Sequence, residues 1–187
     1  GAVSFHCATG KIHMDALRKI IASAICAAAA ATSLAEAQTI AVKVDSSYAE
    51  FLLDTTCSGR DIDEAAVAAM PLVQSQVKHH ANLTAERNMD AFIAGLKSAA
   101  KCEVPENDAY DFAPLIAGKK PFADAVAYFK SRAGEIESDL AANLSQYVPG
   151  DLEYEGELVL SIVGNNCGGF SMDGKFYLAL SCIRDEA

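Results

Sequence analysis

The sequence has 187 residues, of which 51% are hydrophobic, and it carries a formal net charge of −10. This length and composition allow one domain with a buried core. The negative charge repels phosphate backbones and anionic lipid surfaces, so it argues against a protein that binds nucleic acid or a membrane surface.

The first 37 residues have the pattern of a targeting segment. Residues 1–13 show no usable pattern and are set aside as a leader or scar. Arg18-Lys19 then forms a basic n-region, Ile20–Ala31 an apolar h-region and Ala35–Ala37 a small-x-small cleavage site. The apolar run is shorter than the roughly 20 residues that span a bilayer. We therefore expect a signal peptide over residues 14–37 and a secreted or periplasmic mature protein with no membrane anchor.

Four cysteines follow the expected signal peptide: Cys57, Cys102, Cys167 and Cys182. An even number of cysteines in a secreted protein indicates disulfides, and four cysteines allow three connectivities. We favour Cys57–Cys102 and Cys167–Cys182, because the helix and hairpin patterns bring the members of each pair near one another. Free buried thiols are one alternative. A zinc site is another, although the sequence has no Cys-x-x-Cys pair.

Apolar residues at spacings of three and four predict a series of helices after an extended lead-in at Val42–Val44. Ser46-Ser47 caps the first of these helices. Asp61 or Asp63 caps the second. Pro71 lies within the second pattern, where it either kinks the helix or begins a new one at its first turn.

The helical pattern continues through the middle of the chain. Thr84 is predicted to cap a third helix, and a short helix over Tyr110–Ile116 follows. Pro121 suits the start of a longer helical stretch that reaches Tyr147, with an interruption expected at Gly134.

The β-strand signals are concentrated in Glu157–Ile183. Leu158–Val163 is a short apolar run rich in β-branched residues, which is typical of a buried strand. Asp173-Gly174 lies between Phe170–Met172 and Lys175–Leu180, and this is the signal of a two-residue hairpin. We expect an α+β protein in which a mostly helical N-terminal part is followed by a C-terminal antiparallel β-hairpin, with residues 38–187 forming a single domain.

Catalytic motifs are scarce in this sequence. His79 and His80 are adjacent, and neighbours on a helix point about 100° apart, so they do not readily share a metal ion. No Gly-x-Ser-x-Gly motif is present, and the cysteines are better explained as disulfide bridges than as nucleophiles. We therefore expect no catalytic residue, no metal ligand and no cofactor in this chain.

A glycine-rich segment precedes the hairpin, and its candidate cleft residues are Asn165, Asn166, Gly168 and Gly169. It leads into a hairpin and not into a helix, so it lacks the context of a phosphate-binding loop. The segment either lines a substrate cleft or is a plain structural loop.

Four carboxylates alternate with other residues just before the strands: Asp151, Glu153, Glu155 and Glu157. A strand would place all four on one face. Calcium binding is one interpretation, because hard cations take several oxygen ligands. A solvated strand edge whose charge deters aggregation is the other.

The order of these features resembles the N-terminal part of predicted secreted zinc-dependent proteases of bacteria, a gluzincin-like group. The resembling segments are Met70–Val73, His79-His80, Tyr147–Asp151, Leu158–Gly164, Gly168-Gly169 and Phe176–Leu180. In such families a helix with His-Glu-x-x-His follows this kind of hairpin, where two histidines hold zinc and the glutamate activates its water. This sequence has no such motif, and it ends at Arg184–Ala187 with acidic residues typical of a first helical turn.

The resemblance implies an N-terminal fragment of a secreted zinc-dependent metallopeptidase, truncated at its C-terminus and inactive alone. Zinc is then expected only in a full-length relative. The strand Phe170–Leu180 would form a rim where an extended peptide or protein substrate pairs by strand addition. The alternative is a complete secreted, disulfide-bridged binding or inhibitory module of the cell envelope. An unrelated hydrolase with carboxylate or cysteine chemistry is a third interpretation.

Overall fold

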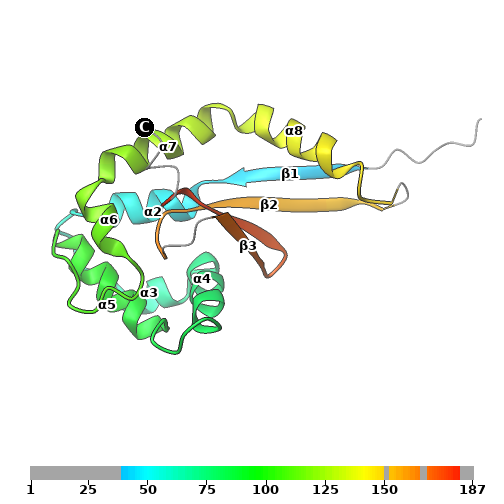
Figure 1. Cartoon of the computed structure of the whole chain (residues 1–187). Helices are drawn as coiled ribbons and strands as arrows, with labels where there is room; N and C mark the ends of the chain where they lie inside the picture. Colours follow the sequence, from blue (N-terminus) through cyan, green and yellow to red (C-terminus); the bar gives the residue numbers. More distant parts are fainter. Residues whose placement is uncertain (1–38, 150–151, 165–167, 182–187) are drawn as a thin grey trace, which may run out of the picture.

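The computed structural model describes residues 39–149, 152–164 and 168–181, and it shows an α+β protein (Figure 1). These residues form one four-stranded sheet and seven helices. The elements are β1 (Ile40–Asp45), α2 (Ser47–Thr55), α3 (Glu64–Ala68), α4 (Pro71–Ala81), α5 (Met89–Ala100), α6 (Phe112–Ala117), α7 (Lys119–Ser131), α8 (Ala133–Leu144), β2 (Tyr154–Ser161), β3 (Gly168–Met172) and β4 (Lys175–Ala179). None of the helices described combines the length and the apolar character needed to cross a bilayer.

The sheet is mixed and has the order β1-β2-β4-β3. The predicted antiparallel hairpin is present as β3 and β4, and its two-residue turn is Asp173-Gly174. Both turn residues have positive φ angles, of 51° and 76°. Aspartate and glycine are among the residues that adopt such angles in two-residue hairpin turns. Strands β1 and β2 pair in parallel, and so do β2 and β4.

The expected order of helices first and strands last is therefore only partly right. The Val42–Val44 segment is not a mere lead-in but part of β1, which pairs with β2 over its whole length, from Ile40 opposite Tyr154 to Asp45 opposite Val159. Parallel strands need a long crossover connection. Helices α2 to α8 supply it, so the helical part lies within the sheet topology rather than before it.

Local sequence signals predicted several of the helix starts, and one of these predictions was wrong. Asp63 caps α3, where its Oδ1 accepts a hydrogen bond from the Ala66 N–H at 3.0 Å, and Pro71 begins a new helix, α4. The prediction that Thr84 caps the third helix is wrong. Asn88 caps α5 instead, because its Oδ1 accepts from the N–H of Ala91 at 3.0 Å.

The last long helical stretch is also divided differently from the prediction. It begins as α7 at Lys119, two residues before Pro121. It breaks at Arg132, which ends α7 and precedes α8, and not at Gly134. The pattern therefore predicted a long helical stretch correctly, but it did not predict the residues at which the two helices begin and end.

The core lies between the helices and the C-terminal half of the strands. Its largest fully buried side chains come from α2, α5, α6, α7, β2, β4 and the adjoining loops: Tyr48, Tyr110, Tyr177, Phe92, Phe112, Phe122, Leu52, Leu96, Leu115, Leu160, Ile162 and Leu180. Strand β2 reflects this placement, because Tyr154 and Glu155 at its start are exposed and all residues from Leu158 to Ser161 are buried.

Helix α8 covers the outer edge of the sheet at β1 (Figure 1). It has no buried residue of its own. Its Glu137 Oε1 accepts a hydrogen bond from the backbone N–H of Val44 at 2.8 Å. The unpaired N–H of an edge strand is a site for unwanted strand pairing, and this contact removes it.

A disulfide joins Cys57 to Cys102, as predicted. Both cysteines have left-handed φ angles, 57° and 60°, and they follow the C-terminal ends of α2 and α5. The backbone N–H of Cys57 donates to the Ala99 oxygen at 2.8 Å. The bridge therefore fastens the chain that leaves α2 to the end of α5. The predicted pair Cys167–Cys182 lies outside the described residues.

We expect that replacing Cys57 and Cys102 together by alanine lowers the free energy of unfolding by about 4 kcal/mol, because the bridge closes a loop with a sequence separation of 45 residues. Urea unfolding of the purified protein measures this difference. The single variant Cys102→Ala is the control, since it breaks the same bridge and should lose about as much. Equal midpoints for the double variant and the unchanged protein would contradict a stabilising bridge.

Candidate functional site

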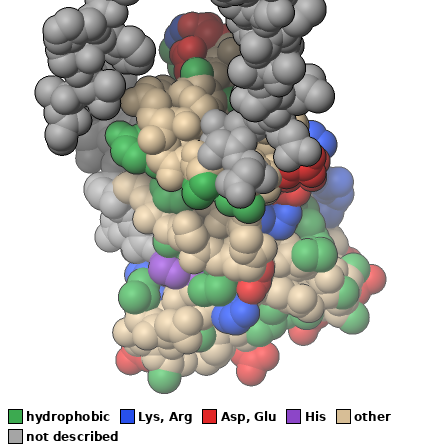
Figure 2. Space-filling view, turned by 90° about the vertical axis from the view of Figure 1, so that its right-hand side faces the viewer, with side chains coloured by type: hydrophobic (Ala, Val, Ile, Leu, Met, Phe, Trp, Pro, Cys, Tyr) green, Lys and Arg blue, Asp and Glu red, His purple; other side chains and the backbone are tan. Residues whose placement is uncertain are grey.

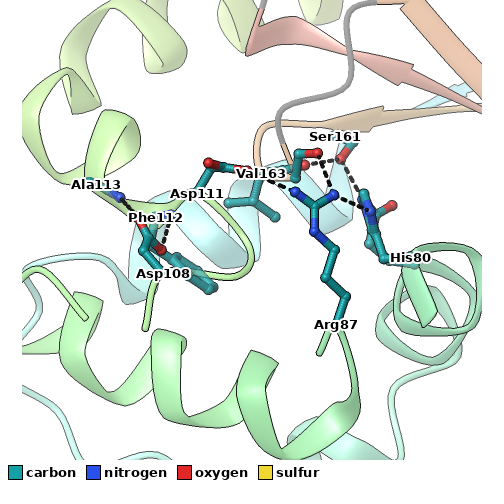
Figure 3. A network of polar contacts seen from close by, with 10 residues as sticks. His80, Arg87, Asp108, Asp111, Phe112, Ala113, Ser161 and Val163 are labelled. Atoms are coloured by element: carbon teal, nitrogen blue, oxygen red, sulfur yellow. Dashed lines mark hydrogen bonds and ion pairs between the residues drawn. The ribbon is translucent and has the colours of Figure 1, made fainter. Parts of the chain in front are cut away.

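Side chains from three segments gather where the chain leaves β2 (Figure 3). His80 comes from the last turn of α4, Arg87 from the loop before α5, and Asp111 from the residue before α6. The carboxyl ends of the parallel strands face the same edge of the sheet. Open α/β sheets commonly place their functional sites at such an edge.

The Arg87 guanidinium is the centre of this cluster. Its Nη1 lies 3.0 Å from His80 Nδ1 and donates to the Gly164 oxygen at 3.3 Å. Its Nη2 forms an ion pair with Asp111 Oδ2 at 3.3 Å. Only 20% of the Arg87 side chain is exposed, so loss of one partner would leave a partly desolvated charge. One side chain thus connects α4, the approach to α6 and the exit from β2.

The hydrogen bonds of His80 define its protonation state. The ring is fully buried, with Arg87 at Nδ1 and the side-chain amide of Gln76 within 2.9 Å of Nε2. Arginine only donates, so Nδ1 is the acceptor and Nε2 carries the proton. The structure places the Gln76 amide nitrogen beside Nε2 and 3.2 Å from Ser161 Oγ, and it leaves the buried amide oxygen without a hydrogen-bond partner. Exchanging the two amide atoms would give the Nε2 proton an acceptor. Burial, followed by the Arg87 charge and by His79, lowers the pKa of His80 from 6.5 to about 4.

Two aspartates arrange the approach to α6. The Asp108 carboxylate accepts from the backbone N–H groups of Phe112 and Ala113 at 2.7 and 2.8 Å, which satisfies the first turn of the helix. Asp111 takes a left-handed φ of 55° and extends its carboxylate toward Arg87. Burial raises the pKa of Asp111, against the lowering effect of Arg87, and Asp108 raises it further.

Gly164 is required by the path of the chain after β2. Its φ is +97°, and a Cβ built there would lie 2.4 Å from His80 Nε2. Its N–H donates to the Tyr110 oxygen at 2.8 Å. A side chain would collide with a buried ring that has no room to move, so the residue must be glycine. The backbone therefore passes directly over the His80 ring.

His79 and His80 have different roles. The His79 ring stacks on Phe170 of β3 with a centroid distance of 3.6 Å, and Phe170 stacks in turn on Tyr177 of β4 at 4.7 Å. Burial lowers the pKa of His79. This histidine is half-buried, and it packs α4 against the hairpin.

The zinc ion that the resemblance implies for full-length relatives does not fit these residues. Both ring nitrogens of His80 are engaged by Arg87 and Gln76. Across the parts of the chain that the structure describes, no three His, Cys, Asp or Glu side chains come together as a group able to hold a metal ion. The cluster holds a neutral imidazole, an ion pair and a backbone turn in fixed positions.

Only two of the four candidate cleft residues belong to the part of the chain that the structure describes. Asn165 and Asn166 lie outside the described residues, while Gly168 and Gly169 begin β3 and are exposed. A Cβ on Gly169 would lie 2.5 Å from both the Phe176 ring and the Tyr177 oxygen, so close packing of β3 on β4 requires this glycine. Of the four acidic residues before the strands, Asp151 is likewise outside the description, and Glu157 forms an ion pair with Lys175.

The hairpin turn is held against α4. Asp173 Oδ2 accepts from Ser75 Oγ at 2.7 Å, and Asp173 Oδ1 pairs with Lys78 Nζ at 2.8 Å. These two hydrogen bonds, that from Lys78 first, lower the pKa of the Asp173 carboxyl. The face of the molecule drawn in Figure 2 carries hydrophobic side chains interspersed with acidic and basic ones, and a histidine reaches its surface.

The register of the hairpin determines which backbone N–H and C=O groups of β3 face away from β4. The pair that flanks a two-residue turn exchanges both of its hydrogen bonds, and the following pairs alternate. Counted from Met172 opposite Lys175, the backbone groups of Phe170 and Met172 face β4, and those of Gly169 and Ser171 face outward. Among the described residues, no backbone hydrogen bond links Gly169 or Ser171 to a segment outside the hairpin.

Sequence reasoning did not find Arg87, Asp111 or Ser75. Each is a single polar residue in a loop or on a helix face, with no neighbouring pattern to mark it. Asp108 lies four positions before Phe112, and the N-cap position of α6 belongs to Asp111, so the bonds of Asp108 to the first turn have no ordinary sequence signal either. The partners of these residues are 7 to 98 positions away in the sequence.

Comparison with known proteins gives no family for this chain. No family model matches it, and neither does any curated protein or solved structure. The functional argument therefore depends on the geometry described above.

We expect the stability of the protein to fall in mild acid because of His80. Its pKa is 6.5 when unfolded and about 4 when folded, so the unfolded chain binds the extra proton between these values. The contribution of the neutral His80 ring to the free energy of unfolding is then complete above pH 6.5. The free energy of unfolding decreases by about 3 kcal/mol as the pH falls to 4. Urea unfolding across this pH range measures the slope.

The variant His80→Gln removes the titrating group. It should be less stable at neutral pH but should lose much less stability on acidification than the unchanged protein. His79→Gln is the matched control and should keep the larger part of the slope. The same slope in His80→Gln as in the unchanged protein would show that other groups cause the acid sensitivity.

Proposed function

We propose that the chain binds an extended peptide, which adds as a further strand along the outer edge of β3. The observation that carries this proposal is the difference between the two edges of the sheet. The β1 edge is covered by α8, and Glu137 takes the free N–H of Val44. The β3 edge directs the backbone groups of Gly169 and Ser171 outward, with no other described segment bonded to them.

The local chemistry of β3 suits close approach by another strand. Gly168, Gly169 and Ser171 are exposed, and two of them have no side chain to hold a neighbour away. Natural proteins commonly protect edge strands with charge, proline or a covering element. This strand has neither charge nor proline between Gly168 and Met172, and this composition supports recognition of its edge by another strand.

The edge is also rigid before any peptide arrives. Asp173 anchors the turn to Ser75 and Lys78 of α4, and His79 stacks on Phe170. Binding therefore orders little of the protein, and the peptide alone loses conformational entropy. Main-chain hydrogen bonds of this kind supply affinity without requiring one particular peptide sequence.

The proposal fits a protein that acts outside the cytoplasm. The Cys57–Cys102 bridge supports an oxidising compartment, and the signal-peptide pattern of residues 14–37 supports secretion. The resemblance to secreted zinc-dependent proteases supports a peptide as the ligand, since it implies a rim where an extended substrate pairs by strand addition. In this reading the chain supplies the peptide-binding rim. Cleavage would require metal-holding residues, and the described part of the chain does not provide a group of them.

We expect Ser171→Pro to weaken peptide binding by at least about tenfold, because proline removes an outward N–H and its ring obstructs an incoming strand. Proline is tolerated at an edge position whose N–H faces solvent, so the fold should persist. Fluorescence anisotropy measures binding of peptides selected from a library of random heptapeptides, with expected Kd values of about 10–100 µM.

Ser171→Ala is the matched control, since it keeps the backbone N–H and should leave the Kd unchanged within about twofold. Equal loss in Ser171→Pro and Ser171→Ala would contradict backbone pairing. A library that yields no ligand tighter than about 1 mM would contradict peptide binding altogether.

A further inference from the structure

A separate cavity lies between α2 and α3, and its volume is about 420 Å³. This volume is within the range of pockets that hold small organic ligands. Its lining comes from the last two turns of α2, the 58–63 loop, α3 and the residue before α4: Phe51, Asp54, Thr55, Ser58, Arg60, Asp61, Ile62, Asp63, Ala66, Val67 and Met70. None of these residues belongs to the β3 edge or to the Arg87 cluster.

The floor of the cavity is apolar. Phe51, Ile62 and Met70 are half-buried and pack against the core, and Val67 is buried within it. Their exposed faces give an apolar ligand a surface that removes it from water. An aromatic or aliphatic body of moderate size is therefore the part of a ligand that this floor would hold.

The rim of the cavity carries an excess of negative charge. Asp54, Asp61 and Asp63 line it together with a single cation, Arg60. The Arg60 Nη2 donates to the backbone oxygen of Asp54 at 2.8 Å. Among the described residues none of the three carboxylates takes part in an ion pair, so the rim attracts a cation.

The rim is fixed in place by its neighbours. The Cys57–Cys102 bridge and the hydrogen bond from the Gly59 N–H to the Ala100 oxygen, at 2.8 Å, attach the loop to α5. Asp63 caps α3 through the Ala66 N–H. A preformed site of this kind costs little to organise when a ligand enters.

We propose that this cavity binds an organic cation, a protonated amine on an apolar body. The apolar body covers Phe51, Ile62, Val67 and Met70, and the ammonium group is held by the rim carboxylates. Charge complementarity decides between this ligand and the alternatives: a neutral apolar molecule gains nothing from the rim, and an anion is repelled by it. The site is independent of peptide binding at β3.

Three small probes of similar shape test the charge preference: phenethylammonium, 2-phenylethanol and phenylacetate. Titration of each into the ¹⁵N- and ¹³C-labelled protein is followed by NMR at Ile62, Val67 and Met70. We expect saturable shifts with phenethylammonium at a Kd of about 1 mM, which is ordinary for a ligand of this size. The alcohol should bind about fivefold more weakly, and the carboxylate should give no saturable shift.

Charge variants of the rim provide a second test. Asp61→Asn should weaken phenethylammonium binding about fivefold, and Arg60→Gln should strengthen it by a similar factor. Asp139→Asn on the exposed side of α8 is the matched control and should change nothing. Equal affinity for the alcohol and the ammonium, tighter binding of phenylacetate, or shifts confined to residues away from the cavity would each overturn the proposal.

Discussion

The Arg87 guanidinium holds together three segments that are far apart in the sequence: the end of α4, the approach to α6 and the exit from β2. Burial first, and the charge of Arg87 second, lower the pKa of His80 and keep its ring neutral. Arg87 also gives Asp111 a partner in a place where burial alone opposes ionisation. Because Gly164 passes over the His80 ring, this contact also sets the direction in which the chain leaves β2.

The hairpin forms the end of the sheet that lies opposite β1. Strand β4 inserts between β2 and β3, so β3 becomes the end of the sheet opposite β1. Helix α8 closes the β1 edge with the Glu137 carboxylate, and α4 supports β3 from below through His79 and the Asp173 turn. Within the described residues one edge of the sheet is covered and the other has outward-facing backbone groups with no bonded neighbour, which is the arrangement that the proposed addition of a ligand strand requires.

Features encoded by neighbouring residues were predictable from the sequence. Asp173-Gly174 predicted the hairpin because few residues other than these adopt its turn, and Pro71 predicted a helix start because its ring fits the first turn. The pairing of β1 with β2 was not predictable, since parallel strands depend on partners more than 100 residues apart. Arg87 was missed for a different reason, because a lone loop arginine has no local pattern and gains its role only when folding brings His80 and Asp111 beside it.

Amide hydrogen exchange along β3, followed by NMR in the protein without and with a bound peptide, tests most directly whether the edge is open. The account predicts slow exchange at Phe170 and Met172 and fast exchange at Gly169 and Ser171 in the free protein, with slowing of the latter pair when peptide is added. Slow exchange at Ser171 in the free protein would mean that another part of the molecule already covers the edge, and it would contradict the account.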